Sequence, residues 1–367
     1  MNKHIAIFLP SLHGGGAERV MLNLAHGLYE EGYRVDIILS KAEGSYLKQL
    51  SKDINLLDLN CKRVLHSLVP LMKYLKNNRP PILLSALGHA NLVALWAVEL
   101  AKTSTKVIVT EHSTLSISIK NSKNLKSKFI PFLMKKFYRK ALSIVTVSKG
   151  VAEDLIKNLN IPKEKVKVIY NPIVTEKLIA LSYEDVEHPW MKNNERPIIL
   201  AAGRLTAAKD YPTMIKSFRK IRNKINAKLI ILGEGEQRKK IEELAENLGI
   251  RCDIDIVGFV ENPYAYMRKA DIFLLTSKWE GFGNVLVEAM ACGTPVVATD
   301  CPNGPREILE DGKYGVLVPP GNVDALTEAV LNHFLQPSNI NKEKLLSRAN
   351  DFHIKKIVKQ YLALFKE

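Results

Sequence analysis

The sequence predicts an α/β protein with two doubly wound domains that face a central cleft, each a parallel sheet covered by helices. Short apolar runs alternate with amphipathic runs along most of the chain, and this alternation lapses once near the middle. A length of 367 residues is enough for about two domains. The composition, 46% hydrophobic and 25% charged, is typical of a folded globular chain and excludes wholesale disorder.

The first half of the chain opens with a strand–helix–strand pattern over Ile5–Leu9, Ala17–Glu30 and Arg34–Leu39. Apolar runs predict further strands at 82–85, 107–110 and 143–147. Helical patterns lie between them, around 62–77, 90–102 and 128–140. Together these elements predict a first domain over residues 1–172.

Proline dipeptides interrupt the pattern in the middle of the chain, and we expect a linker at 173–196. A second domain then covers 197–351. Its predicted strands are 197–202, 228–232, 254–257, 271–275, 295–299 and 316–318, and its predicted helices are 211–224, 235–248, 284–292, 304–309 and 323–334. The remaining segment, 352–367, has one amphipathic helix, which we expect to pack back on the first domain.

The net charge of +15 is spread unevenly. Residues 1–195 hold 28 Lys and Arg against 17 Asp and Glu, whereas residues 196–367 hold 25 against 21. A basic first half predicts that this half meets an anionic surface. The amino terminus has no signal-peptide pattern, and the longest apolar stretch, Ile82–Val98, is broken by polar residues. The four cysteines show no C-x-x-C spacing, so we expect reduced thiols and a cytoplasmic protein.

A glycine-rich segment, His13-Gly14-Gly15-Gly16-Ala17-Glu18-Arg19, follows the first predicted strand. Glycines there allow a ligand to approach backbone N–H groups at a helix N-terminus. The dinucleotide fingerprint is not met, because Arg19 stands where its third glycine belongs and Asp36 falls within a strand. A tight turn that binds no ligand remains an alternative.

Two further motifs follow predicted strands, where open α/β sheets bind ligands. Thr110-Glu111-His112-Ser113 places His112 at such a strand end, although a lone histidine is often structural. Gly203-Arg204-Leu205-Thr206-Ala207-Ala208-Lys209-Asp210 places two cations there. Arg204 and Lys209 have the chemistry to hold a phosphate, and two solvated loop cations are the alternative.

The segment 277–288 carries the most information. Gly281 and Gly283 precede a predicted helix whose first N–H groups would bind an anion. Glu280 precedes this helix and Glu288 lies about two turns later, about 12 Å away if the path is helical. Such a separation excludes a shared-proton dyad and suits hydroxyls at two ends of an extended ligand. Asn303-Gly304-Pro305 opens the next helix and is a second wall of this pocket or a simple turn.

Residues 120–140 contain eight cations and no acid, interleaved with aromatic and aliphatic side chains. This pattern is typical of an amphipathic element that binds anionic lipid. A solvated charged face is the alternative, and no nucleic-acid-binding motif is present. The cations that we expect to face the membrane are Lys123, Lys126, Lys135, Lys136 and Lys140.

Together these motifs resemble the retaining glycosyltransferases of family 4, which have the GT-B architecture of two Rossmann-like domains. The resemblance rests on Gly-Gly-Ala-Glu-Arg, Glu-His-Ser, Gly-Arg-Leu-x-x-x-Lys-Asp and the pair Glu280-x7-Glu288, in this order over about residues 10–335. It also implies that the C-terminal helix returns to the first domain.

The resemblance implies a role for each matching residue. Arg204 and Lys209 would hold the donor diphosphate, Glu280 the transferred sugar and Glu288 the ribose. His112 would face the donor sugar, and Gly15 and Gly16 would border the acceptor. The donor-binding set it implies is Gly203, Arg204, Lys209, Glu280, Gly281, Phe282, Gly283, Asn284, Val285 and Glu288.

The implied activity is transfer of a hexose or N-acetylhexosamine from a nucleotide-sugar, with a UDP-sugar expected, to a polyprenyl-diphosphate-linked saccharide. We expect Arg204 and Lys209 to take the place of a divalent ion, so we expect no metal requirement and no cofactor. The expected setting is bacterial surface polysaccharide or glycoconjugate synthesis, at the inner face of the cell membrane. A soluble acceptor and a non-catalytic sugar-nucleotide sensor are the alternatives. A phosphorylase would need a pyridoxal-bearing lysine, for which no motif is present.

Overall fold

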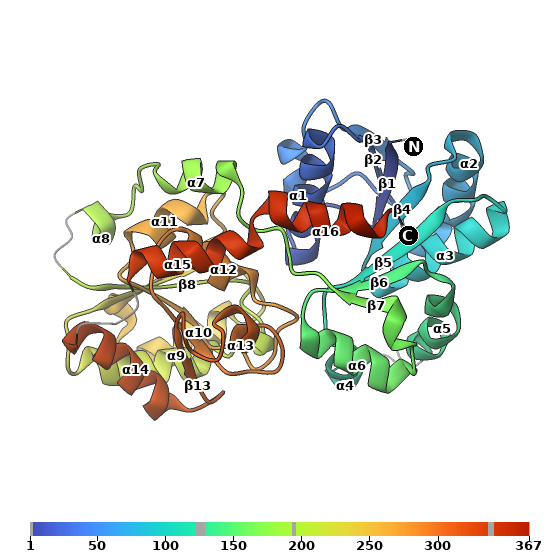
Figure 1. Ribbon diagram of the computed structural model, residues 1–367. Helices are drawn as coiled ribbons and strands as arrows, with labels where there is room; N and C mark the ends of the chain where they lie inside the picture. Colours follow the sequence, from blue (N-terminus) through green and yellow to red (C-terminus); the bar gives the residue numbers. More distant parts are fainter. Residues whose placement is uncertain (1–2, 122–128, 193–195, 337–340, 367) are drawn as a thin grey trace. The chain divides into compact units, whose positions relative to one another are not determined.

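A computed structural model describes residues 3–121, 129–192, 196–336 and 341–366 (Figure 1). The chain divides into two compact units. The first unit comprises Met1–Ile173 with Ile354–Glu367, and the second comprises Val174–His353. Each contains one parallel sheet with helices on its faces, so the α/β, doubly wound prediction is confirmed.

The first unit has a seven-stranded sheet in the order β3-β2-β1-β4-β5-β6-β7. Its strands are β1 (His4–Leu9), β2 (Arg34–Leu39), β3 (Asn55–Asp58), β4 (Ile82–Ala86), β5 (Lys106–Glu111), β6 (Ser143–Thr146) and β7 (Val166–Val168). Its α-helices are α1 (Gly16–Glu30), α2 (Leu68–Asn78), α3 (Gly88–Ala101), α4 (Leu115–Asn121), α5 (Ile130–Phe137), α6 (Lys149–Leu159) and α16 (Ile354–Leu364). A 3₁₀ turn, η4 (Tyr138–Lys140), continues α5 toward β6.

Helices α1 and α16 cover one face of this sheet, although they lie at opposite ends of the sequence (Figure 1). Alternate β1 residues, among them Ile5 and Ile7, share a buried cluster with both helices because strand side chains alternate between faces. A Cβ atom on Gly27 of α1 would lie 2.6 Å from Val358 Cγ2. The glycine therefore allows α16 to pack closely against α1.

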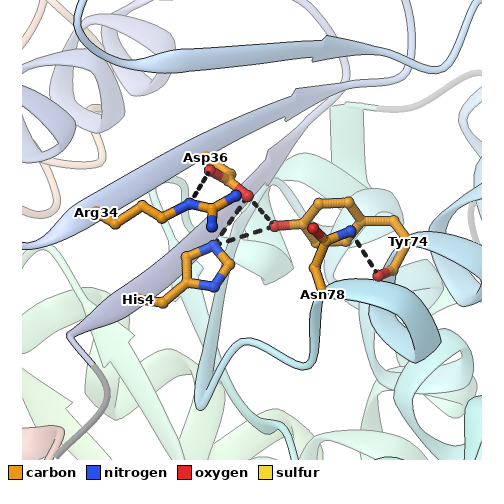
Figure 2. A network of polar contacts seen from close by, with 5 residues as sticks. All are labelled: His4, Arg34, Asp36, Tyr74 and Asn78. Atoms are coloured by element: carbon orange, nitrogen blue, oxygen red, sulfur yellow. Dashed lines mark hydrogen bonds and ion pairs between the residues drawn. The ribbon is translucent and has the colours of Figure 1, made fainter.

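The opposite face of the sheet contains a buried polar network (Figure 2). His4 Nε2 lies 2.9 Å from Asp36 Oδ2, and the Tyr74 hydroxyl of α2 donates to the same oxygen at 2.5 Å. Arg34 Nε lies 3.4 Å from Asp36 Oδ1. Burial raises the pKa of Asp36, but hydrogen bonds from Tyr74 and His4 outweigh burial and hold this pKa below its ordinary value. Asp36 of β2 thus links its strand to β1 and α2, which is a structural role.

The second unit has a six-stranded sheet in the order β10-β9-β8-β11-β12-β13. Its strands are β8 (Ile198–Ala202), β9 (Lys228–Leu232), β10 (Ile254–Gly258), β11 (Ile272–Leu275), β12 (Val296–Thr299) and β13 (Val316–Val318). The α-helices after β8 are α9 (Tyr211–Arg222), α10 (Arg238–Asn247), α11 (Pro263–Lys269), α12 (Asn284–Ala291), α13 (Pro305–Ile308), α14 (Val323–Leu335) and α15 (Lys342–Ala349). Helices α9, α10 and α14 share one buried cluster with this sheet.

The predicted linker at 173–196 is wrong, because the structure assigns residues 174–196 to the second unit. They include α7 (Glu176–Ser182), with a buried Leu178, and α8 (Pro189–Lys192). Asn262 Nδ2 donates to Leu181 O at 2.8 Å, which ties this segment to the start of α11. The dipeptide His188-Pro189 marks the first turn of α8, where proline is favoured.

Candidate active site

In the second unit, the motif that contains Arg204 and Lys209 and the motif that contains Glu280 both lie where the strand order reverses. β8 pairs with β9 on one side and with β11 on the other. The Arg204–Lys209 loop follows β8, and the Glu280 loop follows β11. Open α/β sheets bind ligands outside the carboxyl ends of two such strands. The topology therefore places both motifs at this sheet's preferred binding position.

An ion pair joins the two loops. Lys209 Nζ lies 2.5 Å from Glu280 Oε1, and the Ser277 hydroxyl donates to the same oxygen at 2.6 Å. The side chains of Lys209 and Glu280 are only 20% and 12% exposed. A salt bridge so poorly exposed to water is screened less than a surface pair. The structure thus brings together two residues that the sequence analysis had placed on different parts of a donor.

Backbone contacts hold this ion pair in position. Lys278 N donates to Ala208 O at 2.7 Å, and Thr276 Oγ1 donates to Lys209 O at 2.8 Å. From the neighbouring strand β12, Thr299 Oγ1 donates to Ser277 O at 2.6 Å. These bonds fix both loops, so the charged groups are held on rigid backbone, as electrostatic catalysis requires.

Two buried residues that the sequence analysis missed lie within reach of the Glu280 charge. Burial raises the pKa of the Tyr211 hydroxyl, and the charge of Glu280 adds to this effect. Burial and Glu280 raise the pKa of the Cys301 thiol to about 12, so it stays protonated at neutral pH. Tyr211 directly follows the Lys209-Asp210 pair, and this adjacency was the only sequence signal for it.

Arg204 is placed differently from Lys209. Its side chain is exposed, and its guanidinium has no hydrogen-bond or ion-pair partner among the residues described by the structure. Gly203, which precedes it, is half-buried, and its carbonyl accepts a hydrogen bond from the Tyr211 hydroxyl at 3.1 Å. The guanidinium is therefore free to bind an incoming anion, whereas the ammonium of Lys209 is already paired.

Residues 280–283, which we call the glycine loop, lead into α12. This loop ends at Gly283, whose φ of 101° lies in the left-handed region that glycine tolerates. Helix α12 begins at Asn284, and both Asn284 and Val285 are half-buried, as is Gly281. The Phe282 ring is buried, 5.5 Å from the Phe352 ring between centroids. Phe282 therefore offers a ligand its backbone and not its side chain.

The loop after β12 packs directly against the glycine loop. Glu280 N donates to Pro302 O at 3.3 Å. A Cβ atom on Gly304 would lie 1.7 Å from Phe282 O, so only glycine fits at this position. Asn303-Gly304-Pro305 is therefore a neighbour of the glycine loop, as the sequence analysis had considered.

Glu288 lies in the second half of α12 and is buried, with 5% of its surface exposed. Burial and then the Glu288 charge raise the pKa of the Cys292 thiol, one turn later, to about 12. The two carboxylates of the Glu-x7-Glu motif thus occupy different surroundings. Glu280 is paired with a cation in a loop, whereas Glu288 is packed on a helix.

In the first unit, the strand order reverses between β1 and β4. The glycine-rich segment follows β1, with Gly15 as the N-cap of α1 and Gly16 as its first residue. A Cβ atom on Gly15 would lie 2.3 Å from Glu18 Oε2, so the Glu18 carboxylate lies at this helix start. Arg19 Nε donates to the Tyr46 hydroxyl at 2.8 Å. The segment thus combines a helix N-terminus with a carboxylate and a guanidinium.

His112 directly follows β5 and is half-buried. Its Nε2 lies 3.0 Å from Thr110 Oγ1. Burial lowers the pKa of His112 to about 4, so the imidazole is neutral at neutral pH. A neutral ring can donate or accept a hydrogen bond but brings no positive charge to a ligand.

Where it is described, the basic segment comprises the end of α4, the residue Phe129, α5 and η4. Lys135, Lys136 and Lys140 are exposed, and Lys140 forms an ion pair with Glu99. Phe129 and Phe132 expose 72% and 66% of their surfaces. Lys123 and Lys126 lie outside the described residues.

Two features are absent from the residues that the structure describes. No helix there is long and apolar enough to span a bilayer. No group of three His, Cys, Asp or Glu side chains there is arranged to hold a metal ion.

Comparison with known proteins identifies the family. Residues 14–177 match the family Glycosyltransferase Family 4, and residues 183–349 match Glycosyl transferases group 1. The chain is 31% identical, over 98% of both sequences, to the N-acetylgalactosamine-N,N'-diacetylbacillosaminyl-diphospho-undecaprenol 4-alpha-N-acetylgalactosaminyltransferase of Campylobacter jejuni. The chain belongs to glycosyltransferase family 4. This confirms the resemblance inferred from the motifs.

A further relative and two solved structures are also similar to this family 4 glycosyltransferase. A second Campylobacter jejuni protein, the GalNAc-alpha-(1->4)-GalNAc-alpha-(1->3)-diNAcBac-PP-undecaprenol alpha-1,4-N-acetyl-D-galactosaminyltransferase, is 28% identical over 99% of this chain and 98% of its own length. The fold matches Anabaena HepE in complex with UDP (TM-score 0.80, 22% identity, 98% of each chain). It also matches a glycosyltransferase from Rickettsia africae (TM-score 0.80, 21% identity, 99% and 97% coverage). The architecture is therefore GT-B.

Proposed function

We propose that this glycosyltransferase moves a hexose or N-acetylhexosamine, with retention of configuration, from a UDP-sugar to a polyprenyl-diphosphate-linked saccharide. The observation that carries the proposal is the pairing of Lys209 with Glu280 at the β8/β11 reversal point, in the loop that also carries the exposed Arg204. The setting we infer is bacterial surface polysaccharide or glycoconjugate synthesis at the inner face of the cell membrane.

The donor site follows from charge and backbone geometry. Arg204 binds the diphosphate, and Lys209 joins it when the diphosphate competes with Glu280 for the ammonium. The first N–H groups of α12 add donors from Gly283 to Val285, where a helix N-terminus favours negative charge. Glu280 accepts hydrogen bonds from hydroxyls of the transferred sugar, and Glu288 accepts hydrogen bonds from hydroxyls of the ribose.

Transfer builds positive charge on the sugar while negative charge grows on the departing diphosphate. Fixed cations and helix amides stabilise that negative charge without reorganising during the reaction. These groups supply the role that a divalent ion has in other transferases, so no metal is required. Attack on the same face of the sugar gives retention, and the leaving phosphate takes the proton of the acceptor hydroxyl. His112, neutral at neutral pH, donates or accepts a hydrogen bond on the donor sugar.

The acceptor proposal rests on relatives and on charge. Both Campylobacter relatives carry names of enzymes acting on undecaprenol-linked saccharides. The first unit carries most of the net positive charge and the exposed Phe129 and Phe132 beside Lys135, Lys136 and Lys140. A lipid-linked acceptor lies in the membrane, and this surface is suited to bind there.

The test measures release of nucleoside diphosphate from a panel of sugar nucleotides, with an undecaprenyl-diphosphate-linked saccharide, a soluble saccharide or no acceptor. We expect one UDP-sugar to be consumed rapidly only with the lipid-linked acceptor. Equal rates with the soluble saccharide would favour a soluble acceptor. Binding of UDP-sugar with no turnover under any condition would indicate a sensor and contradict the proposal.

A further inference from the structure

The start of helix α2 presents two large apolar side chains to water. The 3₁₀ turn η2 (Val64–Ser67) runs directly into α2, so Leu65 and Val69 lie about one turn apart on the same side. Leu65 is 58% exposed and Val69 is 70% exposed. Single exposed apolar residues are normal on a protein surface, whereas neighbouring ones with a polar rim are typical of a contact surface.

The rest of α2 is packed firmly, which fixes the direction of this pair. Leu71, Tyr74 and Leu75 of α2 are buried. The Tyr74 hydroxyl donates to Asp36 of β2, as Figure 2 shows. Leu65 and Val69 therefore cannot turn inward unless α2 rotates and breaks a buried hydrogen bond.

Cations surround the exposed pair, and no acid balances them. Lys62 and Arg63 precede η2, Lys73 lies one turn after Val69, and all three are exposed. Residues 59–98 contain no Asp or Glu. Among the residues that the structure describes, none of the three cations forms an ion pair. The exposed pair and these cations, which we call the α2 patch, are Lys62, Arg63, Leu65, Val69 and Lys73.

A surface helix of the second unit shows a different pattern. On α10, Arg238 Nε lies 3.1 Å from Glu242 Oε1, and Lys239 Nζ lies 3.8 Å from Glu243 Oε1. Pairs four residues apart neutralise the charge of such a helix face locally. The α2 patch has no such acids, so its positive charge remains available to an anionic surface.

The α2 patch and the basic segment lie at the same edge of the first unit. Helix α3 packs against η2 and α2 and also against α5, and Figure 1 shows it between them. Helix α2 leads to the start of β4, and α5 leads through η4 to the start of β6. The first turns of α2 and α5, with Leu65, Val69, Phe129 and Phe132, therefore lie toward the carboxyl edge of the sheet, where His112 ends β5.

We propose that the α2 patch is a second membrane-binding segment of the first unit. Leu65 and Val69 insert among the headgroups of an anionic bilayer, and the cations around them bind lipid phosphates. Apolar side chains flanked by cations bind at the bilayer interface in this way. The inference rests on the proposed function, which places the acceptor in a membrane. Two linked contacts bind far more tightly than either alone, so loss of either should release most of the protein.

The first test measures the apolar contribution. The whole protein is sedimented with vesicles of phosphatidylglycerol and phosphatidylethanolamine in equal parts. Leu65→Gln/Val69→Gln should lower the partition coefficient about tenfold or more, because it removes apolar surface that the bilayer buries. The fold-loss should persist between about 0.1 M and about 1 M salt, since salt screens charges only. The matched control is Leu335→Gln/Leu346→Gln, two exposed leucines of the second unit, which should bind like the wild type.

The second test measures the cations. Lys62→Glu/Arg63→Glu/Lys73→Glu should lower partition more than about tenfold at low salt and only slightly at about 1 M salt. Acids just before a helix are favourable, so the first two changes should not harm folding. The control of equal net charge, Lys216→Glu/Lys220→Glu/Lys224→Glu on and after α9, should lower partition far less. Thermal melting of each variant checks folding.

A third variant reports insertion directly. Val69→Trp places a fluorescent side chain in the α2 patch, and lipids brominated near the top of their acyl chains quench tryptophan on contact. An interfacial segment reaches about 5–10 Å into this region, so the added emission should be quenched. Leu335→Trp, on the second unit, should add emission that these lipids do not quench.

The outcomes separate this inference from the proposed function. If Leu65→Gln/Val69→Gln binds vesicles like the wild type, or the added emission of Val69→Trp is not quenched, the α2 patch does not face the bilayer and the inference is overturned. Transfer in detergent micelles, with no bilayer present, should have the same kcat in Leu65→Gln/Val69→Gln and the wild type. A slow variant there would show that the patch serves the acceptor or the fold, which also overturns its membrane role. A wild type that binds vesicles through the patch but transfers no sugar would overturn the proposed function alone.

Discussion

Lys209 Nζ lies 2.5 Å from Glu280 Oε1, so the ammonium proposed to hold the diphosphate is already bound to a carboxylate. Arg204, by contrast, is exposed and free to bind an anion. We predict that Lys209→Ala and Arg204→Ala each lower kcat by about 10²–10³, the loss expected for one preorganised donor to a developing charge. Steady-state release of nucleoside diphosphate measures this. The control is Lys216→Ala, which changes an exposed lysine of α9 and should leave kcat unchanged. Near-normal rates in both Lys209→Ala and Arg204→Ala would contradict their assignment to the diphosphate.

The contact also predicts non-additive effects in a double mutant. Lys209→Ala leaves the Glu280 carboxylate without its cation, so part of its cost comes from Glu280 itself. The double variant Lys209→Ala/Glu280→Gln should therefore lose less than the product of the two single effects. Residues in direct contact show coupling energies of about 0.5–3 kcal/mol. Strictly multiplicative losses would show that the two side chains act independently.

Substitutions of Glu280 and Glu288 should change different kinetic parameters, because the two carboxylates lie in different surroundings. A sugar contact that strengthens as charge develops acts on rate, whereas a ribose contact acts on binding. Glu280→Gln should therefore chiefly lower kcat, and Glu288→Gln should chiefly raise the KM for the donor. Initial rates over a range of donor concentrations separate the two. A Glu288→Gln variant with unchanged KM and abolished kcat would reverse the roles.

The sequence predicted the position of the candidate residues in the fold where motifs coincide with strand ends. Arg204, Lys209 and Glu280 stand in loops after β8 and β11, and parallel strands bring such loops to one edge of a sheet. It did not predict that Lys209 pairs with Glu280, because a contact between residues 71 positions apart depends on loop conformation. Nor did it predict the burial of Glu111 with Asn91 and Tyr138, since three separate elements supply these side chains.

The fold shows the same limits. Inner strands of the sheets, such as β1 and β9, were predicted closely because they are buried on both faces and are apolar from their second residue onward. The edge strand β3 was missed, since its residues are mostly exposed and carry no apolar run. The segment 173–196 was mistaken for a linker because proline marks helix starts as well as loops.

Metal removal gives a further prediction. If the cations and the start of α12 stabilise the leaving diphosphate, activity needs no divalent ion. We expect transfer to continue at the same rate after treatment with excess chelator. The control adds Mg²⁺ or Mn²⁺ to the treated enzyme, which should change nothing. Loss of activity on chelation with recovery on addition of metal would contradict the proposed donor site.

The Asp36 network predicts a dependence of stability on pH. The folded-state pKa of Asp36 is depressed below its ordinary value of 3.8. A carboxylate of this kind stabilises the fold fully above its unfolded-state pKa, and this contribution is lost as the pH falls through the lower folded-state pKa. Tyr74→Phe removes one donor to a buried carboxylate and should cost about 1–3 kcal/mol of unfolding free energy at neutral pH.

Denaturant unfolding at neutral and acidic pH measures this effect. Once Asp36 is protonated in both proteins, the difference between Tyr74→Phe and the wild type should shrink. The control is Tyr29→Phe, since Tyr29 is 41% exposed and should cost nothing measurable. A Tyr74→Phe penalty that stays constant down to strongly acidic pH would show that Asp36 does not set it.

The last prediction concerns membrane attachment through the basic segment. Each Lys or Arg near an anionic surface contributes about 1 kcal/mol, so four engaged cations give on the order of 4 kcal/mol at low salt. The exposed Phe129 and Phe132 add apolar insertion, which salt does not screen. Replacement of five lysines by Glu should therefore release the protein from anionic liposomes; they are Lys123, Lys126, Lys135, Lys136 and Lys140.

The same variant should slow transfer to a lipid-linked acceptor while sparing slow hydrolysis of the donor, because the residues proposed to bind the donor diphosphate lie in the second unit. The matched control reverses five exposed lysines of the second unit, namely Lys216, Lys220, Lys224, Lys239 and Lys240. It changes the net charge equally but leaves the basic segment intact, so it should still sediment with liposomes. If both variants sediment like the wild type, the segment does not attach the protein to membranes, and the soluble-acceptor alternative gains support. If both are released, net charge alone governs binding.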